Sequence, residues 1–258
     1  MIEVRKLTKS YEGRTVINDI SVVFETGKTN LIIGRSGSGK TVLLKNVIGL
    51  VQPDAGEVLF DGRDLMKMSK HEVLNLRREM GLLFQGSALF DSMSVLENVM
   101  FPLDMFSNLT WRERCKRAMS CLERVELMEE TYDLMPSEIS GGMMKRAAIA
   151  RAIVLHPKYL FCDEPNSGLD PKTSLVIDAL IHSITKEYGM TTVINTHDMN
   201  SVMNIGENIV FIHDGIREWT GTKEQVIHSD NKPLLDFIFA SDLLKKAKEM
   251  EEEISREG

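Results

Sequence analysis

One short motif restricts the fold of this chain more than any other feature. Residues 34–41 read GRSGSGKT, which matches the pattern GxxxxGK[ST], and they lie between the apolar run LII and the helical run TVLLKNVIGL. Glycines at these positions let the backbone curl so that successive N–H groups point inward at phosphate oxygens. The N-terminus of the following helix adds the positive end of its dipole. The sequence therefore predicts a phosphate-binding loop between a strand and a helix.

Each position of this loop has an expected role. Lys40 should reach the β- and γ-phosphates of a nucleotide, and Thr41 should coordinate Mg²⁺ through its hydroxyl. ATP and Mg²⁺ are therefore the expected ligands. A glycine-rich turn that matches by chance is the alternative, and the strand and helix on either side argue against it. The residues expected around the phosphates are Gly34, Ser36, Gly37, Ser38, Gly39, Lys40 and Thr41.

Two carboxylates end a second apolar run, YLFCDE at 159–164. The carboxyl ends of strands in doubly wound sheets face the ligand crevice, so Asp163 and Glu164 should lie beside the phosphate-binding loop. Asp163 suits the shell of Mg²⁺, and Glu164 suits the base that orients an attacking water. Two acids after a strand are usually only a solvated strand end. The phosphate-binding loop earlier in the chain favours the catalytic interpretation.

The apolar runs predict a parallel α/β core that a helical block interrupts. Strand-like runs lie at 16–25, 29–34, 56–62, 80–85, 159–164, 191–196 and 208–215. The later runs are apolar on both faces, as parallel strands covered by helices should be. Between them, Ser94 to Glu97 and Thr110 to Glu113 have the capping-box pattern that opens a helix. The helical block is therefore expected to form an inserted lobe.

The segment Ile139-Ser140-Gly141-Gly142-Met143 resembles the LSGGQ signature of the ATP-binding-cassette (ABC) ATPases. The resemblance covers roughly residues 2–222 and includes the family's motifs in order. It implies a RecA-like P-loop NTPase core with an antiparallel β subdomain and an inserted α-helical subdomain. The ABC ATPase domain would span 1–222, with the core and β subdomain at 1–86 and 156–222, the helical subdomain at 87–155, and a helical extension at 223–258.

The same resemblance implies roles for four further residues. Tyr11 resembles the aromatic residue that stacks on adenine, and Gln85 resembles the Q-loop residue that contacts Mg²⁺ and senses the transport subunit. Residues 167–170, which end at Asp170, resemble the D-loop, and His197 resembles the switch histidine that faces the γ-phosphate. Taken singly, these would be a surface ring, a strand-end amide and ordinary loop residues. Their joint order supports the functional interpretation.

A shared active site follows from the signature segment. Ser140, Gly141 and Gly142 precede the helical run MMKRAAIARAIVL and so form an exposed helix N-terminus that suits an anion. In the resembling family that anion is the ATP held by the other subunit, which implies a head-to-tail pair, expected here as a homodimer. Met143 departs from the usual glutamine and removes a polar contact near the nucleotide.

Three segments narrow the expected function. SGGMMKRAAIARAI, FQGSALFDSMSVLENV and NTHDMNS resemble the ATPases of MCE-type lipid transporters. We therefore expect an ATPase subunit that couples dimer closure to phospholipid movement by a membrane permease, with an MCE-domain lipid-binding protein as a further partner. An ABC ATPase that drives or regulates a membrane partner mechanically, without moving a substrate, is the alternative.

The permease is expected to dock near Gln85 and residues 90–106, because methionine-rich and aromatic surfaces adapt to partner helices. The alternative is that these side chains fill the core of the helical lobe. The residues in question are Phe90, Met93, Val95, Met100, Phe101, Met105 and Phe106.

Composition and motif spacing argue against other classes of protein. The net charge of −7 argues against a nucleic-acid partner, which needs a basic footprint. The stretch between Lys40 and Ser140 is also too short for the long coiled coils of chromosome-structuring ATPases.

No apolar run reaches the length of a membrane span. The expected location is cytoplasmic, at the inner face of the membrane through the permease. The three cysteines have no pairing or metal-binding spacing and are assigned no chemistry.

The end of the chain divides into an apolar and a charged part. An apolar cluster at 234–239 needs a hydrophobic surrounding, whereas 245–257 is mostly charged and suits solvent. The segment 234–244 either covers its own domain or braces the partner subunit, as a C-terminal extension does in the resembling lipid-transport ATPases. The second interpretation is the favoured one.

Overall fold

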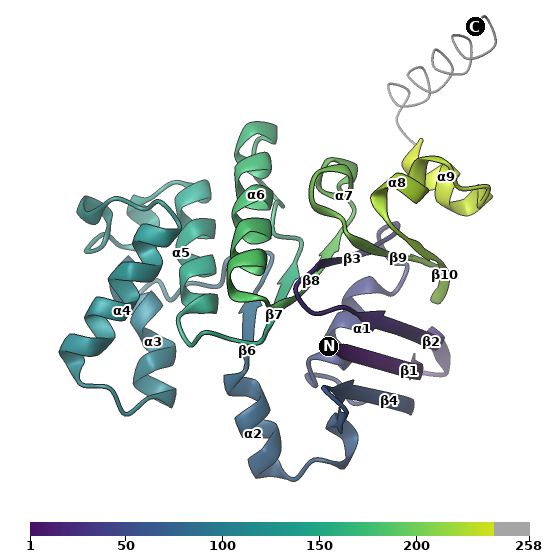
Figure 1. Ribbon diagram of the computed structural model, residues 1–258, viewed down its shortest axis with the longest axis horizontal. Helices are drawn as coiled ribbons and strands as arrows, with labels where there is room; N and C mark the ends of the chain where they lie inside the picture. Colours follow the sequence, from purple (N-terminus) through teal and green to yellow (C-terminus); the bar gives the residue numbers. More distant parts are fainter. Residues whose placement is uncertain (240–258) are drawn as a thin grey trace, which may run out of the picture.

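The protein, a computed structural model described over residues 1–239, folds around two β-sheets (Figure 1). The larger sheet has six strands in the order β10-β9-β3-β8-β7-β6. Five of them are parallel, and β10 joins the edge antiparallel to β9. Its strands are β3 (Thr29–Ile33), β6 (Met80–Leu83), β7 (Tyr159–Asp163), β8 (Thr191–Thr196), β9 (Asn208–His213) and β10 (Ile216–Gly221).

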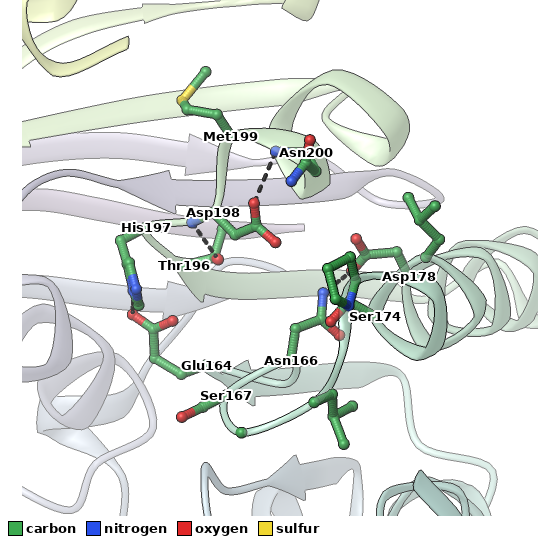
Figure 2. Close-up of a pocket in the computed structure, with 14 residues that line it drawn as sticks. Glu164, Asn166, Ser167, Ser174, Asp178, Thr196, His197, Asp198, Met199 and Asn200 are labelled. Atoms are coloured by element: carbon green, nitrogen blue, oxygen red, sulfur yellow. Dashed lines mark hydrogen bonds and ion pairs between the residues drawn. The ribbon is translucent and has the colours of Figure 1, made fainter. Parts of the chain in front are cut away.

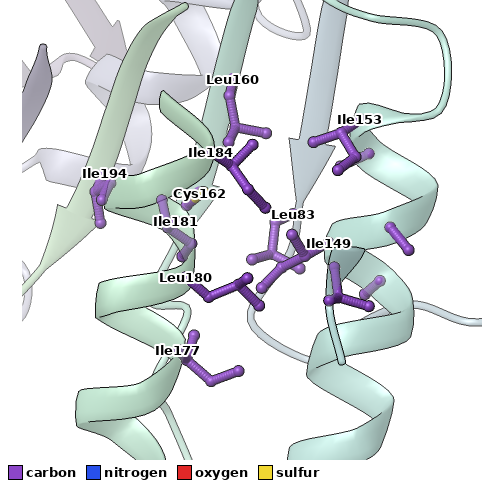
Figure 3. Close-up of a cluster of buried hydrophobic side chains, with 14 of the residues drawn as sticks. Leu83, Ile149, Ile153, Leu160, Cys162, Ile177, Leu180, Ile181, Ile184 and Ile194 are labelled. Carbon is purple, nitrogen blue, oxygen red and sulfur yellow. The ribbon is translucent and has the colours of Figure 1, made fainter. Parts of the chain in front are cut away.

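Both faces of the five parallel strands are largely buried, as expected for strands covered by helices, whereas the edge strand β10 is exposed or half-buried. In β3, Leu31 and Ile33 belong to a core on one face, while Ile32 belongs to a second core on the other face. The first core lies under the helices α5 (Gly141–Ile153) and α6 (Pro171–Tyr188), whose side chains meet over β6 and β7 (Figure 3). The expected parallel core is confirmed.

The smaller sheet is antiparallel, with its four strands in the order β2-β1-β4-β5. These are β1 (Ile2–Tyr11), β2 (Arg14–Phe24), β4 (Ala55–Phe60) and β5 (Arg63–Asp64). Strand β1 was not among the expected strands. Lys6 has a φ of 47°, and the pairing register shifts between Val4 and Leu7. Such a bulge breaks the two-residue alternation that identifies a strand in a sequence.

The remaining helices cover the sheets and form the inserted block. Around the sheets lie α1 (Lys40–Val47), α2 (Lys70–Arg78), α7 (Met199–Ile205), α8 (Lys223–Ile227) and α9 (Lys232–Ile238). Beyond β6, α3 (Val95–Phe106) and α4 (Trp111–Arg124) pack with α5 at one end of the molecule (Figure 1). Short 3₁₀ helices lie at Leu65–Lys67, Glu129–Thr131 and Pro136–Glu138.

Both predicted capping boxes are confirmed. Ser94 accepts a hydrogen bond from the Glu97 amide and Thr110 accepts one from the Glu113 amide, while each glutamate side chain bonds back to the cap residue. These bonds satisfy amide groups that the first turn of a helix leaves unpaired.

The apolar part of the C-terminal segment packs on its own domain. Leu234, Phe237 and Ile238 are buried in the same core as Phe211 of β9, and the Phe211 and Phe237 rings lie 5.4 Å apart. These three side chains therefore form a local cover, which is the alternative that the sequence left open. The rest of the expected extension, residues 240–258, lies outside the described residues.

The structure also bears on two expectations from the sequence, which concern membrane-spanning helices and the cysteines. Within residues 1–239, no helix is long and apolar enough to cross a membrane. Cys115, Cys121 and Cys162 are buried free thiols, and burial raises the pKa of Cys121 to about 11.

Candidate functional site

The loop at 34–39 connects the end of β3 to the start of α1 at the carboxyl edge of the large sheet. Gly34 has a φ of 150°, and a Cβ there would lie 2.3 Å from the Ile212 carbonyl oxygen. Gly39 has a φ of 105°, and a Cβ there would lie 2.8 Å from Cγ2 of Ile17. Because strands β9 and β2 press on the loop at these points, no side chain fits at either position.

The Lys40 side chain is folded inside this loop. Its Nζ donates hydrogen bonds to the carbonyl oxygens of Gly34 at 2.9 Å and Arg35 at 3.1 Å. Burial lowers the pKa of Lys40, while the nearby carboxylates of Glu164 and Asp163 act in the opposite direction. The buried ammonium therefore lies close to both acids, in the position that a phosphate-binding lysine requires.

The hydroxyl of Ser38 gives a test of fit for phosphate. Its Oγ is buried and has no hydrogen-bond partner. An unpaired buried hydroxyl is costly, and a phosphate oxygen would satisfy it. Together with Lys40, this orphaned donor makes the loop suitable for the phosphates of a nucleotide.

A third residue joins Thr41 to Asp163. The Nδ2 atom of Asn195 lies 3.2 Å from Thr41 Oγ1 and 2.5 Å from Asp163 Oδ1. A hydroxyl and a carboxylate held side by side are oxygen ligands of the kind that Mg²⁺ prefers, so the residues present fit that ion. Sequence reasoning missed Asn195, although an amide inside the apolar run TTVINT is itself a signal.

Glu164 lies directly beyond β7 in a strained backbone conformation. Its φ is 48°, in the left-handed region that non-glycine residues rarely adopt. The Glu164 amide donates to the Asn195 carbonyl oxygen at 2.9 Å, which holds the residue in place. Its Oε1 lies 2.8 Å from Nδ1 of His197, so the expected base and the expected switch histidine are in contact (Figure 2).

Gln85 is placed differently from its expected metal contact. Its Nε2 donates to Ser167 Oγ at 3.0 Å, and no hydrogen bond among residues 1–239 joins it to Thr41 or Asp163. Lys145 of α5 donates to the Gln85 carbonyl oxygen from a buried position, and burial lowers the pKa of Lys145. The structure thus ties Gln85 to the D-loop segment and to α5.

The signature segment opens α5 beside a cleft that the phosphate-binding loop does not line. Ser140 is the N-cap of α5 and accepts a hydrogen bond from the Met143 amide at 3.3 Å. A cleft beside it is lined by 140–143, Arg146, 168–170 and Thr173, and by no residue of 34–41. Asp170 caps α6 at this cleft by accepting from the Thr173 amide at 3.1 Å. The two halves of the expected nucleotide site therefore do not meet within one chain.

Met143 and Tyr11, two residues expected near the nucleotide, lie at the edges of the site. Met143 is partly buried and packs against the main core, which accounts for an apolar residue at this position. Tyr11 ends β1 with an exposed ring, and Lys9 Nζ lies 5.4 Å from its centroid. The ring is thus open to a further flat partner.

The cleft drawn in Figure 2 contains a buried polar cluster that sequence reasoning missed. Asn166 Nδ2 donates to Asp178 Oδ1 at 2.8 Å and to Ser201 Oγ at 3.0 Å, which ties the segment between β7 and α6 to α6 and α7. Burial raises the pKa of Asp178 to about 6, despite the hydrogen bonds that lower it, and its Oδ2 has no partner.

The raised pKa predicts a pH effect on stability. Between the ordinary pKa of 3.8 and about 6, the folded state holds a proton on Asp178 that the unfolded state has lost. This residue's contribution to the free energy of unfolding therefore falls as pH rises through that window. Asp178→Asn should be more stable than the native protein by about 2 kcal/mol near pH 7, and the difference should vanish near pH 4. Denaturant unfolding across pH measures this, with the exposed Asp133→Asn as control. A gain that does not depend on pH would contradict it.

The residues expected at the permease surface divide into a buried, an exposed and a half-buried set, the last being Met93 and Phe101. Val95 and Met100 are buried in the core of the helical block, so they do not belong to a docking surface. Phe90, Met105 and Phe106 are exposed, by 41%, 59% and 37%. The Phe90 ring packs on Phe101 at 4.7 Å between centroids, and Arg78 lies 5.7 Å from the Phe106 ring. The core alternative thus holds for the first set only.

Comparisons with known proteins found a matching family and similar chains. A family described as ABC transporter matches residues 17–167. The "Intermembrane phospholipid transport system ATP-binding protein MlaF" of Haemophilus influenzae is 37% identical over 238 residues, which cover 92% of this chain and 90% of that protein. The "Methionine import ATP-binding protein MetN" of Carboxydothermus hydrogenoformans is 39% identical over 218 residues, which cover 83% of this chain and 64% of that protein.

A solved structure extends the likeness to the fold. It is described as the dimeric structure of a post-hydrolysis state of the ATP-binding cassette MJ0796 bound to ADP and Pi. That chain is 33% identical, with a TM-score of 0.79, and the match covers 86% of this chain and 99% of that one.

Proposed function

The chain belongs to the ABC transporter family of ATP-binding proteins, and from this membership we propose that it is the ATPase subunit of a phospholipid transporter of the MCE type. It is an ABC ATPase, and cassettes of this family dimerise and work with membrane permeases. The identity of the transported substrate is a more specific proposal than the ATPase activity. The match to a phospholipid-transport ATPase over 90% of that protein's length supports it, as do the segments that resemble MCE-type ATPases.

The proposed chemistry assigns one task to each group in the site. Lys40 and the amides of 36–41 would hold the phosphates, and Thr41 and Asp163 would hold Mg²⁺, together with Gln85 once it is released from Ser167. Mg²⁺, when bound, neutralises charge that develops on the transferred phosphoryl group. Glu164 polarises the attacking water, and His197 orients the Glu164 carboxylate through their 2.8 Å contact.

A second copy of the chain completes the site in this proposal. The Ser140 cleft contains the open N-terminus of α5, which favours an anion, yet no residue of its own phosphate-binding loop lines it. A head-to-tail pair would place the ATP of one subunit against Ser140, Gly141 and Gly142 of the other. Asp170 stands at the same cleft and would lie at that junction.

Docking of the permease is proposed on the exposed part of the helical block near Gln85. Met105→Glu should leave the ATPase activity and stability of the isolated protein unchanged, because this side chain is 59% exposed. It should reduce recovery of the protein in the membrane fraction of its native cells, because a buried charge at an interface is unfavourable. Met128→Glu is the matched control, since Met128 is 71% exposed on another part of the block.

A substitution at the buried Met100 distinguishes a defect in docking from a defect in folding. Met100→Glu should destabilise the isolated protein, because Met100 is buried in the block's core. If Met105→Glu unfolds the isolated protein in the same way, the core alternative holds for Met105 too. If its membrane recovery equals that of Met128→Glu, docking at this surface is wrong.

The cargo is tested with the complex purified from its native membrane and reconstituted into vesicles. Phospholipid should stimulate ATP turnover and move between vesicles in an ATP-dependent manner, whereas methionine and other amino acids should do neither. Stimulation by methionine but not by phospholipid would reject the lipid cargo and favour the function named for the MetN relative. Turnover coupled to no transported substrate would favour the mechanical or regulatory alternative. In cells, the proposed place is the cytoplasmic face of the membrane, held there by the permease.

A further inference from the structure

Asn195 is a polar residue at a buried strand position, where an apolar side chain would pack better. It lies in β8, where every residue is buried, and its own exposed fraction is 0%. Its register partners are Asp163 on β7 and Ile32 on β3, so it stands between the strand that ends at the acids and the strand that enters the phosphate-binding loop.

Asn195 forms hydrogen bonds with three residues of the site, Thr41, Asp163 and Glu164. Its Nδ2 lies within hydrogen-bond distance of Thr41 Oγ1 (3.2 Å) and Asp163 Oδ1 (2.5 Å), and its carbonyl oxygen accepts from the Glu164 amide (2.9 Å). Its Oδ1 is buried and has no partner. Leaving such an acceptor unpaired is destabilising, and a β-branched apolar residue in this strand would avoid that cost. Packing within the strand therefore does not account for the unpaired Oδ1 of this residue.

We propose that Asn195 is a positioning residue that sets the affinity of the site for its divalent cation. Its amide group holds the Thr41 hydroxyl and the Asp163 carboxylate in one geometry before the cation arrives, and Oδ1 is the acceptor for a hydrated cation. Groups that orient metal ligands in this way typically change metal affinity 10- to 100-fold when mutated. The inference rests on the proposed assignment of Thr41 and Asp163 as cation ligands.

Two substitutions at Asn195 should shift cation binding in opposite directions. Asn195→Val removes both the donor and the acceptor, so the Mg²⁺ concentration for half-maximal effect on ATP binding should rise about 10- to 100-fold. Asn195→Asp places a second carboxylate beside Asp163, so that concentration should fall, while repulsion between the two acids should destabilise the cation-free protein. In EDTA, the ATP affinity of Asn195→Val should stay close to that of the native protein.

The measurements are equilibrium ATP binding in EDTA and in titrations of Mg²⁺ and Mn²⁺, together with thermal unfolding with and without cation. Thr192→Val is the matched control, because Thr192 is a fully buried polar residue of the same strand whose hydroxyl bonds to Thr185 instead. It should lower stability without changing the cation dependence.

Three results would overturn the inference. The first is an unchanged cation dependence in Asn195→Val, and the second is an equal loss of ATP affinity in EDTA. The third, which decides the matter if Asn195→Val does not fold, is an Asn195→Asp protein whose cation dependence is native or weaker. If Mg²⁺ has no effect on ATP binding by the native protein, the assignment of Thr41 and Asp163 fails instead, so the two failures are distinguishable.

Discussion

Replacing Glu164 with glutamine should lower ATP turnover by about 100- to 10,000-fold, the range that a lost general base produces, while ATP still binds. Glutamine keeps the size of the side chain and can still pair with His197, which now contacts Glu164 at 2.8 Å. It lacks the negative charge that polarises water. Because the phosphate-binding loop and the Thr41–Asp163 pair are untouched, nucleotide should accumulate in a closed dimer that cannot reopen through hydrolysis.

Steady-state phosphate release, ATP binding and sedimentation with ATP together check this result. Glu130→Gln is the control, since Glu130 is an exposed acid in the helical block, away from Asp163 and Lys40. A Glu164→Gln protein that turns over at close to the native rate would show that another group acts as the base.

Mixing two inactive variants should restore ATPase activity if the sites are shared between subunits. Lys40→Ala removes the buried ammonium from the phosphate-binding loop. Ser140→Asp keeps a residue that caps α5 well, but places a negative charge where the partner's phosphates would approach. Each variant alone should be nearly inactive, because both of its sites carry the defect. A mixed dimer has one site with both defects and one site with neither, so activity should return.

The experiment measures turnover after the two variants are mixed under conditions that allow subunits to exchange. Thr110→Asp is the control for the cap substitution, because Thr110 is the exposed N-cap of α4 and lines neither part of the site. If Ser140→Asp alone retains native turnover, or if mixing restores nothing although mixed dimers form, the shared site is wrong.

Much of the fold was predictable because local sequence patterns, such as apolar runs and capping boxes, determine its strands and helices. The seven apolar runs expected as strands all form strands, and the capping boxes at Ser94 and Thr110 begin helices as expected. Strand β1 escaped prediction because its bulge near Lys6 interrupts the alternation of buried residues. Helix α6 was also missed, although Asp170 caps it and Pro171 begins it, because that segment was interpreted only as a loop motif.

The sequence by itself determined which residues could bind phosphate and act as acids and bases, because glycine spacing, a lysine and strand-end carboxylates are chemical properties of the chain. Only the tertiary structure decided which of these residues meet. Strand order brought Asn195 beside Thr41 and Asp163, directed Gln85 to Ser167, and left Ser140 in a cleft away from Lys40. Such contacts join residues far apart in the chain, and they depend on sheet register and on the packing of α5, which no local pattern encodes.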